Sequence, residues 1–186
     1  MGGSALAGTT SGSGLLIGSE FYSASPDSPL GELGQFQRDN VKGIDSLPII
    51  VAHEHAHILQ LRAGGTWSHG SKTLLEQSLM EGSADFIGEL SSGGNINRHV
   101  FPYAMAHEAE LWQQFSAGMH GKDWSQWLYN QGSAATTRPG DLGYFIGYRI
   151  AEAYYGRQAD KQAALKAIIE MMVADDFLAQ SGYSPN

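Results

Sequence analysis

The segment His53-Glu54-His55-Ala56-His57 constrains this chain more than any other feature of its sequence. Residues four apart lie on the same face of an α-helix, so a helix here directs the side chains of His53 and His57 toward one point. Two imidazoles at this spacing, with the carboxylate of Glu54 beside them, suit a metal ion. The fold must therefore bring further ligands to one side of this helix.

The residues around the histidines indicate a helix over residues 48–63. Pro48 suits a first helical turn, Asp45 or Ser46 can cap its start, and Gly64-Gly65 can end it. Apolar residues surround the histidines nearly all round this helix, which predicts that it is buried. Buried histidine and glutamate side chains need partners, and a metal ion would supply one.

Two other interpretations of the histidines remain open. His53, His55 and His57 alternate, and alternation on a β-strand places three side chains on one face. A cluster of these residues without a metal is the second alternative. The helix signals on both sides of the segment favour the helical interpretation, as does a second helix-like segment that carries suitable carboxylates.

This second segment, residues 72–90, has leucine and phenylalanine side chains at near-helical spacing. Glu81, which lies 24 positions after His57, is the candidate third metal ligand, and Asp85 follows it by one helical turn. Metal-bound histidines commonly donate their other ring N–H to a carboxylate, and this is the role expected for Asp85. Small residues such as Gly82 are expected to let this helix approach the histidine helix. The alternative is that both carboxylates belong to an ordinary solvated face.

These motifs resemble those of the gluzincins, thermolysin-like zinc peptidases with H-E-x-x-H and a downstream glutamate ligand. The chain is similar in particular to bacterial families of predicted Zn-dependent proteases that carry H-E-x-x-H, then E-G-x-A-D, then a glycine–tyrosine repeat. The matching stretches are His53 to His57, Glu81 to Phe86, Gly143-Tyr144-Phe145-Ile146-Gly147-Tyr148-Arg149 and, more weakly, residues 14–20. The interval from His57 to Glu81 is somewhat longer than in the best-known gluzincins, so the connecting loop differs.

The resemblance implies a zinc metallopeptidase with one Zn²⁺ per chain and a zincin-like, thermolysin-like catalytic domain. His53, His57 and Glu81 would bind the zinc. Glu54 would take a proton from zinc-bound water as general base and later give it to the leaving amine.

A tyrosine or histidine commonly stabilises the oxyanion in gluzincins, so the resemblance also implies such a donor. Tyr148 is the expected donor and Tyr144 the second choice, while His107 and His120 are less favoured. The alternative is that these tyrosines form a core helix face with their hydroxyls at its edge.

Near the N-terminus, Leu15-Leu16-Ile17 indicates a strand. Gluzincins pair extended substrate with an edge strand beside the zinc, which makes Leu15, Leu16, Ile17 and Gly18 the candidate substrate-binding residues. A plain edge strand is the alternative. The glycine-rich residues 1–13 are expected to form a flexible tail.

The length of 186 residues predicts a single domain over residues 1–186. A small N-terminal sheet and many helical patterns predict an α+β fold in which helices predominate. Further helices are expected over residues 101–119, 123–129, 141–155, 161–173 and 175–180.

The net charge of −8 disfavours nucleic acid and anionic membranes as main partners. The resemblance to zinc peptidases implies a peptide or protein substrate. No run reaches the roughly 18 apolar residues of a membrane span. The absence of cysteine excludes disulfides and thiolate ligands and leaves the compartment undetermined. The start of the chain lacks the basic region and apolar core of a signal peptide. Oligomeric state and cleavage specificity are not encoded in any pattern recognised here.

Two competing functions remain. The same metal and base could hydrolyse another amide or an ester, and a non-catalytic interaction protein could keep zinc for stability. Structural zinc favours four protein ligands and has no use for an unliganded carboxylate such as Glu54. Three candidate ligands are visible, which favours an open position and catalysis.

Overall fold

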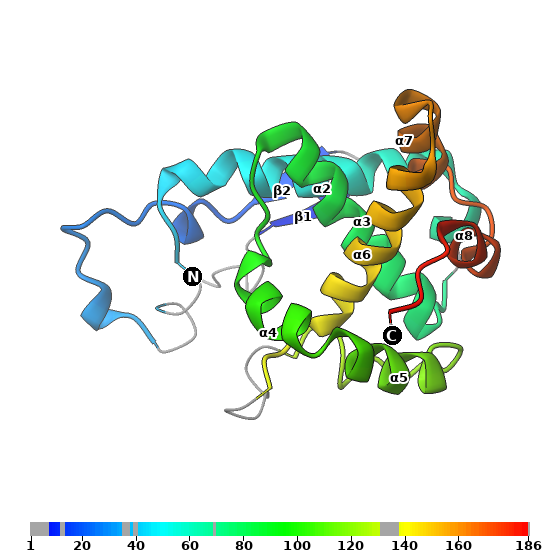
Figure 1. The fold of residues 1–186 in the computed structure, drawn as a ribbon. Coiled ribbons are helices and arrows are strands. Elements are labelled where there is room, and N and C mark those ends of the chain that lie inside the picture. The colour runs from blue at the N-terminus through cyan, green and yellow to red at the C-terminus, as the bar shows by residue number, and fades with distance from the viewer. Residues whose placement is uncertain are drawn as a thin grey trace.

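The computed structural model describes residues 8–11, 14–34, 38, 41–68, 70–130 and 138–185. Its strands are β1 (Gly8–Ser11) and β2 (Gly14–Ile17). Its helices, coloured along the chain in Figure 1, are α2 (Leu47–Ala63), α3 (Leu74–Ser92), α4 (Phe101–Ala106), α5 (Glu108–Gly118), α6 (Leu142–Arg157), α7 (Lys161–Ile169) and α8 (Ala174–Ser181). The described part of the chain is therefore predominantly helical with one small antiparallel sheet, as the sequence predicted.

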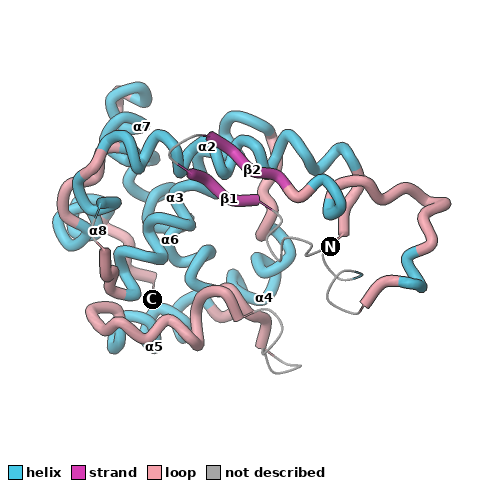
Figure 2. The backbone as a smooth tube through the Cα atoms, turned by 180° about the vertical axis from the view of Figure 1, so that it is seen from behind, coloured by secondary structure: helices cyan, strands magenta, loops and turns pink. Residues whose placement is uncertain are grey.

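The two strands form an antiparallel pair in which Gly8 lies opposite Ile17. The pair packs along α2, and Figure 2 shows it from the side opposite to Figure 1. Residues 8–11 were expected in a flexible tail, but they form β1, because pairing with β2 satisfies their backbone groups. The other residues of 1–13 lie outside the described part of the chain.

The main hydrophobic core lies where α3 crosses α6, and helix glycines permit the close crossing. A Cβ atom added at Gly147 of α6 would lie 1.8 Å from the backbone oxygen of Ser78, and one at Gly82 of α3 would lie 2.2 Å from the backbone nitrogen of Tyr148. Gly82 was expected to face the histidine helix; it faces α6 instead. Gly88, whose added Cβ would lie 3.2 Å from the backbone nitrogen of His53, brings α3 against α2.

Helix α2 buries its polar face, whereas a surface helix of a globular protein usually buries its apolar face. Its buried residues are Ile50, His53, Glu54, Ala56, His57 and Gln60. Val51 and Leu61 on other sides of the helix are 36% and 46% exposed. The helix is therefore buried on one face only, and not nearly all round as predicted. Burial of polar groups costs free energy unless they find partners, so this face carries the interactions that position α2.

Two predicted helices differ from the structure. Residues 101–119 form two helices, α4 and α5, because the backbone leaves the helical region at His107 (φ −122°, ψ 19°). Residues 123–129 form turns. The predictions for residues 48–63, 72–90, 141–155, 161–173 and 175–180 agree with α2, α3, α6, α7 and α8 to within a few residues.

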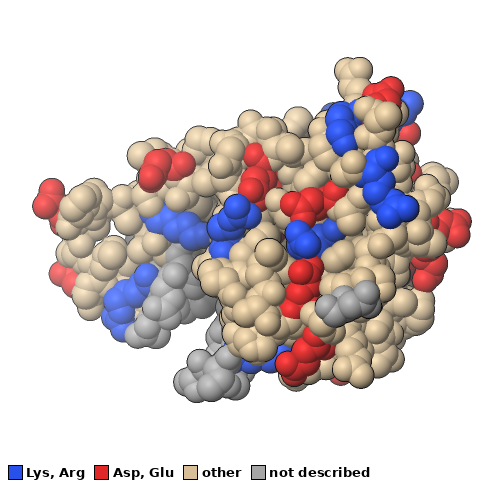
Figure 3. Space-filling view, in the orientation of Figure 1, with Lys and Arg blue, Asp and Glu red and all other residues tan. Residues whose placement is uncertain are grey.

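No helix in the described ranges is long and apolar enough to cross a bilayer. Figure 3 shows one face of the molecule, on which Lys and Arg side chains are interspersed with Asp and Glu.

Candidate metal centre

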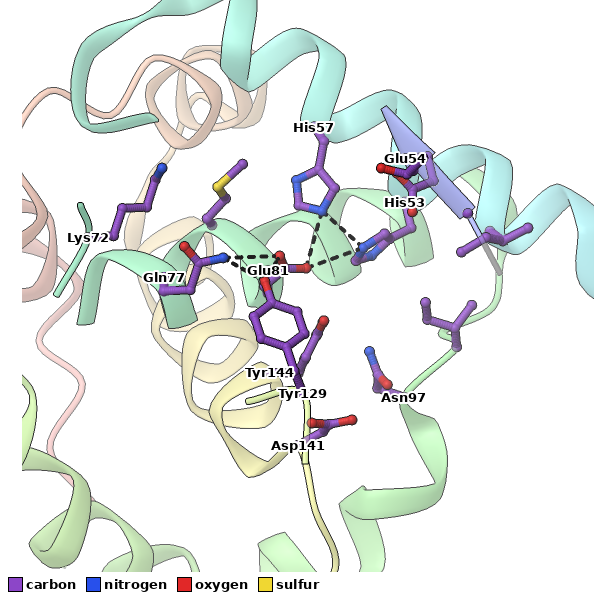
Figure 4. Close-up of a pocket in the computed structure, with 15 residues that line it drawn as sticks. His53, Glu54, His57, Lys72, Gln77, Glu81, Asn97, Tyr129, Asp141 and Tyr144 are labelled. Carbon is purple, nitrogen blue, oxygen red and sulfur yellow. Dashed lines mark hydrogen bonds and ion pairs between the residues drawn. The ribbon is translucent and has the colours of Figure 1, made fainter. Parts of the chain in front are cut away.

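Three potential ligand atoms from α2 and α3 converge where the two helices pack together. Nε2 of His57 lies 3.1 Å from Nε2 of His53 and 3.2 Å from Oε2 of Glu81, and the third side of this triangle measures 3.6 Å. All three residues are buried, with exposures of 4–7%. Figure 4 shows the triangle, with His53 and His57 from α2 above Glu81 from α3.

The hydrogen bonds of the two rings fix where their protons lie. Nδ1 of His53 lies 2.7 Å from Oδ1 of Asp85, and a carboxylate can only accept, so His53 donates through Nδ1. Nδ1 of His57 lies 2.8 Å from Oε1 of Gln60. Gln60 Nε2 donates to the backbone oxygen of Met80 over 3.0 Å, which fixes the amide orientation and makes its Oε1 the acceptor. Both imidazoles therefore turn Nε2 toward Glu81, where a neutral ring offers a lone pair.

This donor set fits zinc. Zinc lies about 2.0–2.1 Å from histidine nitrogen, and neighbouring ligands of a tetrahedral ion at such distances lie about 3.3–3.5 Å apart. The observed separations of 3.1, 3.2 and 3.6 Å match that requirement. With both rings neutral, these atoms present three convergent electron pairs, and a cation placed between them satisfies all three. His53, His57 and Glu81 are the group that could hold a metal ion among the described residues.

Each ligand is held by a further side chain. Asp85, which holds His53, accepts a second hydrogen bond from Asn97 over 2.8 Å through Oδ2. Gln60, which holds His57, is fully buried and also donates to Ser83 over 2.9 Å. Such outer partners fix ring orientation and raise the basicity of the ligating nitrogen.

Glu81 uses its two oxygens differently. Oε2 faces the histidines, whereas Oε1 accepts a hydrogen bond from the hydroxyl of Tyr129 over 2.6 Å and lies 3.3 Å from Nε2 of Gln77. Gln77 also donates to the Tyr129 oxygen over 2.6 Å. Burial raises the pKa of Tyr129 and the charge of Glu81 raises it further, so the hydroxyl keeps its proton. For Glu81, burial raises the pKa, but the nearby histidines outweigh burial and hold the pKa well below its ordinary value.

Glu54 lies on the same buried face of α2, one residue after His53, and makes no contact in the triangle. The backbone of β1 passes close to it: an added Cβ at Gly8 would lie 3.0 Å from its Oε1. Burial raises the pKa of Glu54, while the charges of His53 and His57 oppose the shift. A carboxylate with a raised pKa next to a metal site suits proton transfer near neutral pH.

The centre opens into a pocket of about 470 Å³. One wall comes from β1 and the start of α2, and the opposite wall from α3, Tyr129 and the start of α6 (Figure 4). The lining residues are Gly8, Thr9, Ile50, His53, Glu54, His57, Lys72, Gln77, Met80, Glu81, Ile96, Asn97, Tyr129, Asp141 and Tyr144.

The two candidate tyrosines of α6 lie apart. Tyr144 is among the described residues that line the pocket, and its ring centre lies 6.4 Å from that of His53. Tyr148, one turn later, packs its ring against Phe86 and Phe101 at 5.5 and 5.1 Å, and the charge of Glu89 adds to burial in raising its pKa to about 12. The structure does not bring Tyr148 to the pocket, because the tight crossing of α6 and α3 turns its side chain into the aromatic core.

The candidate substrate-binding residues are also displaced from the pocket. Leu15, Leu16 and Ile17 lie in β2, and Gly18 follows it. In the sheet β2 is paired with β1, and it is β1 that contributes Gly8 and Thr9 to the pocket lining. Leu16 is 62% exposed. Of the two described strands, β1 is thus the one that contributes to the pocket lining.

The two less favoured histidines also lie elsewhere. His107 stacks on Tyr103 and donates to its backbone oxygen over 2.8 Å. His120 is exposed, 3.7 Å from Asp175.

Four residues that hold the centre were missed by sequence analysis. Gln60 and Gln77 carried a weak signal, because each lies one helical turn from a ligand, His57 and Glu81 respectively. Tyr129 and Asn97 carried none, since both come from irregular segments whose placement depends on the whole fold.

A comparison with family models matches residues 28–174 to the family described as Predicted Zn-dependent protease (DUF2268). The matched range includes all three triangle residues and Tyr144. No curated protein and no solved structure is similar enough to the chain to count as a match.

Proposed function

The chain belongs to this family of predicted Zn-dependent proteases, and from that premise we propose that it is a zinc metallopeptidase that uses Glu54 as general base. The observation that carries the proposal is the combination of three buried, convergent ligand atoms with a further buried carboxylate, that of Glu54, which is not one of them. A structural zinc site would close the fourth position with a protein ligand, whereas a catalytic site leaves it open. His53, His57 and Glu81 would hold one zinc ion per chain.

When bound, zinc polarises the substrate carbonyl and makes hydroxide available near neutral pH. Glu54 takes a proton from the attacking water, and then delivers it to the amine that leaves as the peptide bond breaks. Its raised pKa supports both halves of this transfer, because the group must first accept a proton and then release it. Asp85 and Gln60 keep His53 and His57 in the tautomer that directs Nε2 inward.

We assign the oxyanion donor to Tyr144 rather than to Tyr148. Tyr144 lines the pocket beside His53, and burial together with the charge of Glu81 holds its pKa well above the ordinary value. A protonated hydroxyl in this position can donate a hydrogen bond to the carbonyl oxygen as negative charge develops there.

We assign substrate pairing to β1 in place of Leu15, Leu16, Ile17 and Gly18. One edge of β1 pairs with β2, and among the described residues no strand pairs with its other edge. An extended peptide added to that edge would pass close to Glu54. A histidine helix, a glutamate helix and an edge strand around one pocket support a zincin-like arrangement.

The experiment that tests the function compares wild type with Glu54→Gln and His57→Ala in zinc content and in cleavage of a peptide library. Wild type is expected to contain about one zinc per chain and to cleave peptides. Glu54→Gln should keep the zinc and lose roughly 10²–10⁴-fold in rate, whereas His57→Ala should lose the metal.

Each alternative has its own outcome in this experiment. Zinc binding without any peptide cleavage, but with hydrolysis of simple esters or amides, would assign the same site to a different substrate. Zinc binding without hydrolysis of any kind would favour a zinc-stabilised interaction protein. A folded wild type that takes up no zinc would overturn the metal site itself.

A further inference from the structure

The two oxygens of Glu81 have different partners, and this difference affects how the carboxylate can bind a metal ion. A carboxylate can bind zinc through one oxygen or through both. With two histidines already bound, a second oxygen would take the position that a catalytic site must leave open. Partners that hold Oε1 of Glu81 away from the metal would therefore help to keep this position open.

Tyr129 and Gln77 are placed to do this. The Tyr129 hydroxyl donates to Oε1 of Glu81 over 2.6 Å. Gln77 Nε2 donates to the Tyr129 oxygen over 2.6 Å, which leaves the tyrosine proton for the carboxylate, and Gln77 also lies 3.3 Å from Oε1. Two donors thus occupy the oxygen that does not face the histidines.

The backbone shows that the position of Tyr129 is specifically held. Its φ of 57° lies in the left-handed region, which is unfavourable for an aromatic residue. The next residue, Asn130, exchanges two hydrogen bonds with Asp141: its N–H donates to Oδ1 of Asp141 over 2.9 Å, and its own Oδ1 accepts from the Asp141 N–H over 2.7 Å. Tyr129 is 58% exposed as a whole, yet its hydroxyl reaches a buried metal ligand. The ring contacts Trp124 and Tyr144 at centroid distances of 6.5 and 6.2 Å, and the same conformation carries the hydroxyl to Glu81.

We propose that Tyr129 and Gln77 form a clamp on Oε1 of Glu81 that keeps this carboxylate bound to zinc through one oxygen and so preserves the open coordination position. Tyr129 is then a positioning residue that acts through Glu81. This inference rests on the zinc site of the proposed function, and it extends that function to the residues that keep the site open.

The test measures access to the open position with azide, in protein loaded with Co²⁺ in place of zinc. The visible absorption of Co²⁺ reports its coordination, and an anion that binds the open position changes this absorption. In Tyr129→Phe the second oxygen of Glu81 is expected to reach the metal, which alters the starting spectrum and weakens azide binding by about tenfold or more. Tyr148→Phe, which removes a hydroxyl that lies beside Glu89 and away from the pocket, is the matched control and should keep the wild-type spectrum and azide affinity.

Gln77→Leu provides a second, independent variant. It should shift the spectrum in the same direction but less, and the double variant should resemble Tyr129→Phe alone because both residues act on one oxygen. A wild-type spectrum and wild-type azide affinity in both Tyr129→Phe and Gln77→Leu would overturn the clamp.

The outcomes separate the clamp from the proposed function. Clamp-dependent spectra in a protein that cleaves no peptide would support the clamp and count against the peptidase. Peptide cleavage with unchanged spectra would support the peptidase and count against the clamp. A wild type that binds neither Co²⁺ nor Zn²⁺ would overturn both.

Discussion

Asp85 on α3 accepts a hydrogen bond from Nδ1 of His53 on α2 over 2.7 Å, and its other oxygen accepts one from Asn97 over 2.8 Å. Both oxygens of this carboxylate are thus engaged, and the carboxylate is 2% exposed. The ring of His53 is held in an orientation that turns Nε2 toward His57 and Glu81. The first prediction concerns this contact.

Asp85→Ala is expected to weaken zinc binding by about 10–100-fold, because His53 loses the partner that orients it. Competition with a chromophoric chelator measures this affinity, and circular dichroism checks the fold. Asp176→Ala, which removes an exposed aspartate of α8, should leave the affinity unchanged. Equal zinc affinity in Asp85→Ala and wild type would show that the contact does not support the site.

Zinc binding is expected to release a proton from His53. Burial alone lowers the pKa of His53, but the carboxylates of Asp85 and Glu81 outweigh burial and raise the pKa from 6.5 to about 10. The metal-free ring is therefore protonated at pH 8, and zinc binds only the neutral ring. Zinc affinity should thus keep rising with pH above 6.5 and up to about 10, where an ordinary histidine would level off.

Calorimetry of zinc binding at pH 8, in buffers with different ionisation enthalpies, counts the released protons. The expected release from wild type exceeds that from Asp85→Asn, because the substitution removes one of the charges that raise the pKa of His53. The same proton release from both proteins would contradict this assignment.

Gly147→Ala is expected to destabilise the protein by roughly 3 kcal/mol or more, since the new methyl group would meet the backbone oxygen of Ser78 at 1.8 Å and backbone cannot turn aside. Gly156→Ala, in the same helix α6, is the matched control. An added Cβ there meets nothing within 4 Å, so the change should stabilise by about 0.5–1 kcal/mol. Urea denaturation measures both. A small effect of Gly147→Ala would mean that the two helices do not cross as closely as described.

Tyr144→Phe is expected to lower kcat by about 10²–10³-fold with little change in zinc content, because it removes the proposed donor to the oxyanion. Tyr148→Phe should keep kcat within a few-fold of wild type, since its ring lies among Phe86 and Phe101. Steady-state kinetics on a cleaved library peptide distinguishes the two. The reverse pattern would restore Tyr148 as the donor.

The sequence by itself determined the local part of this protein. Helical spacing is a property of the backbone, so two histidines four apart share a face wherever that helix lies. Glu81 and Asp85 are also four apart and share one face of α3 for the same reason. Gly93 ends that helix in the left-handed conformation, as a glycine at this place suggests. The periodicity of apolar residues likewise predicted most of the helices to within a few residues.

Only the tertiary structure decided the features that depend on contacts between segments distant in the sequence. Tyr144 and Tyr148 share a face of α6, so which of them reaches the pocket depends on where along the helix Gly147 packs against α3, and helical spacing cannot fix that position. Tyr129 reaches Glu81 across 48 positions of sequence from a non-helical segment, so no periodic pattern could reveal it. Strand β1, predicted as a tail, was fixed by pairing with β2 and by packing on α2. Such long-range contacts depend on the free energy of the whole packed chain, whereas local spacing depends only on the geometry of one helix.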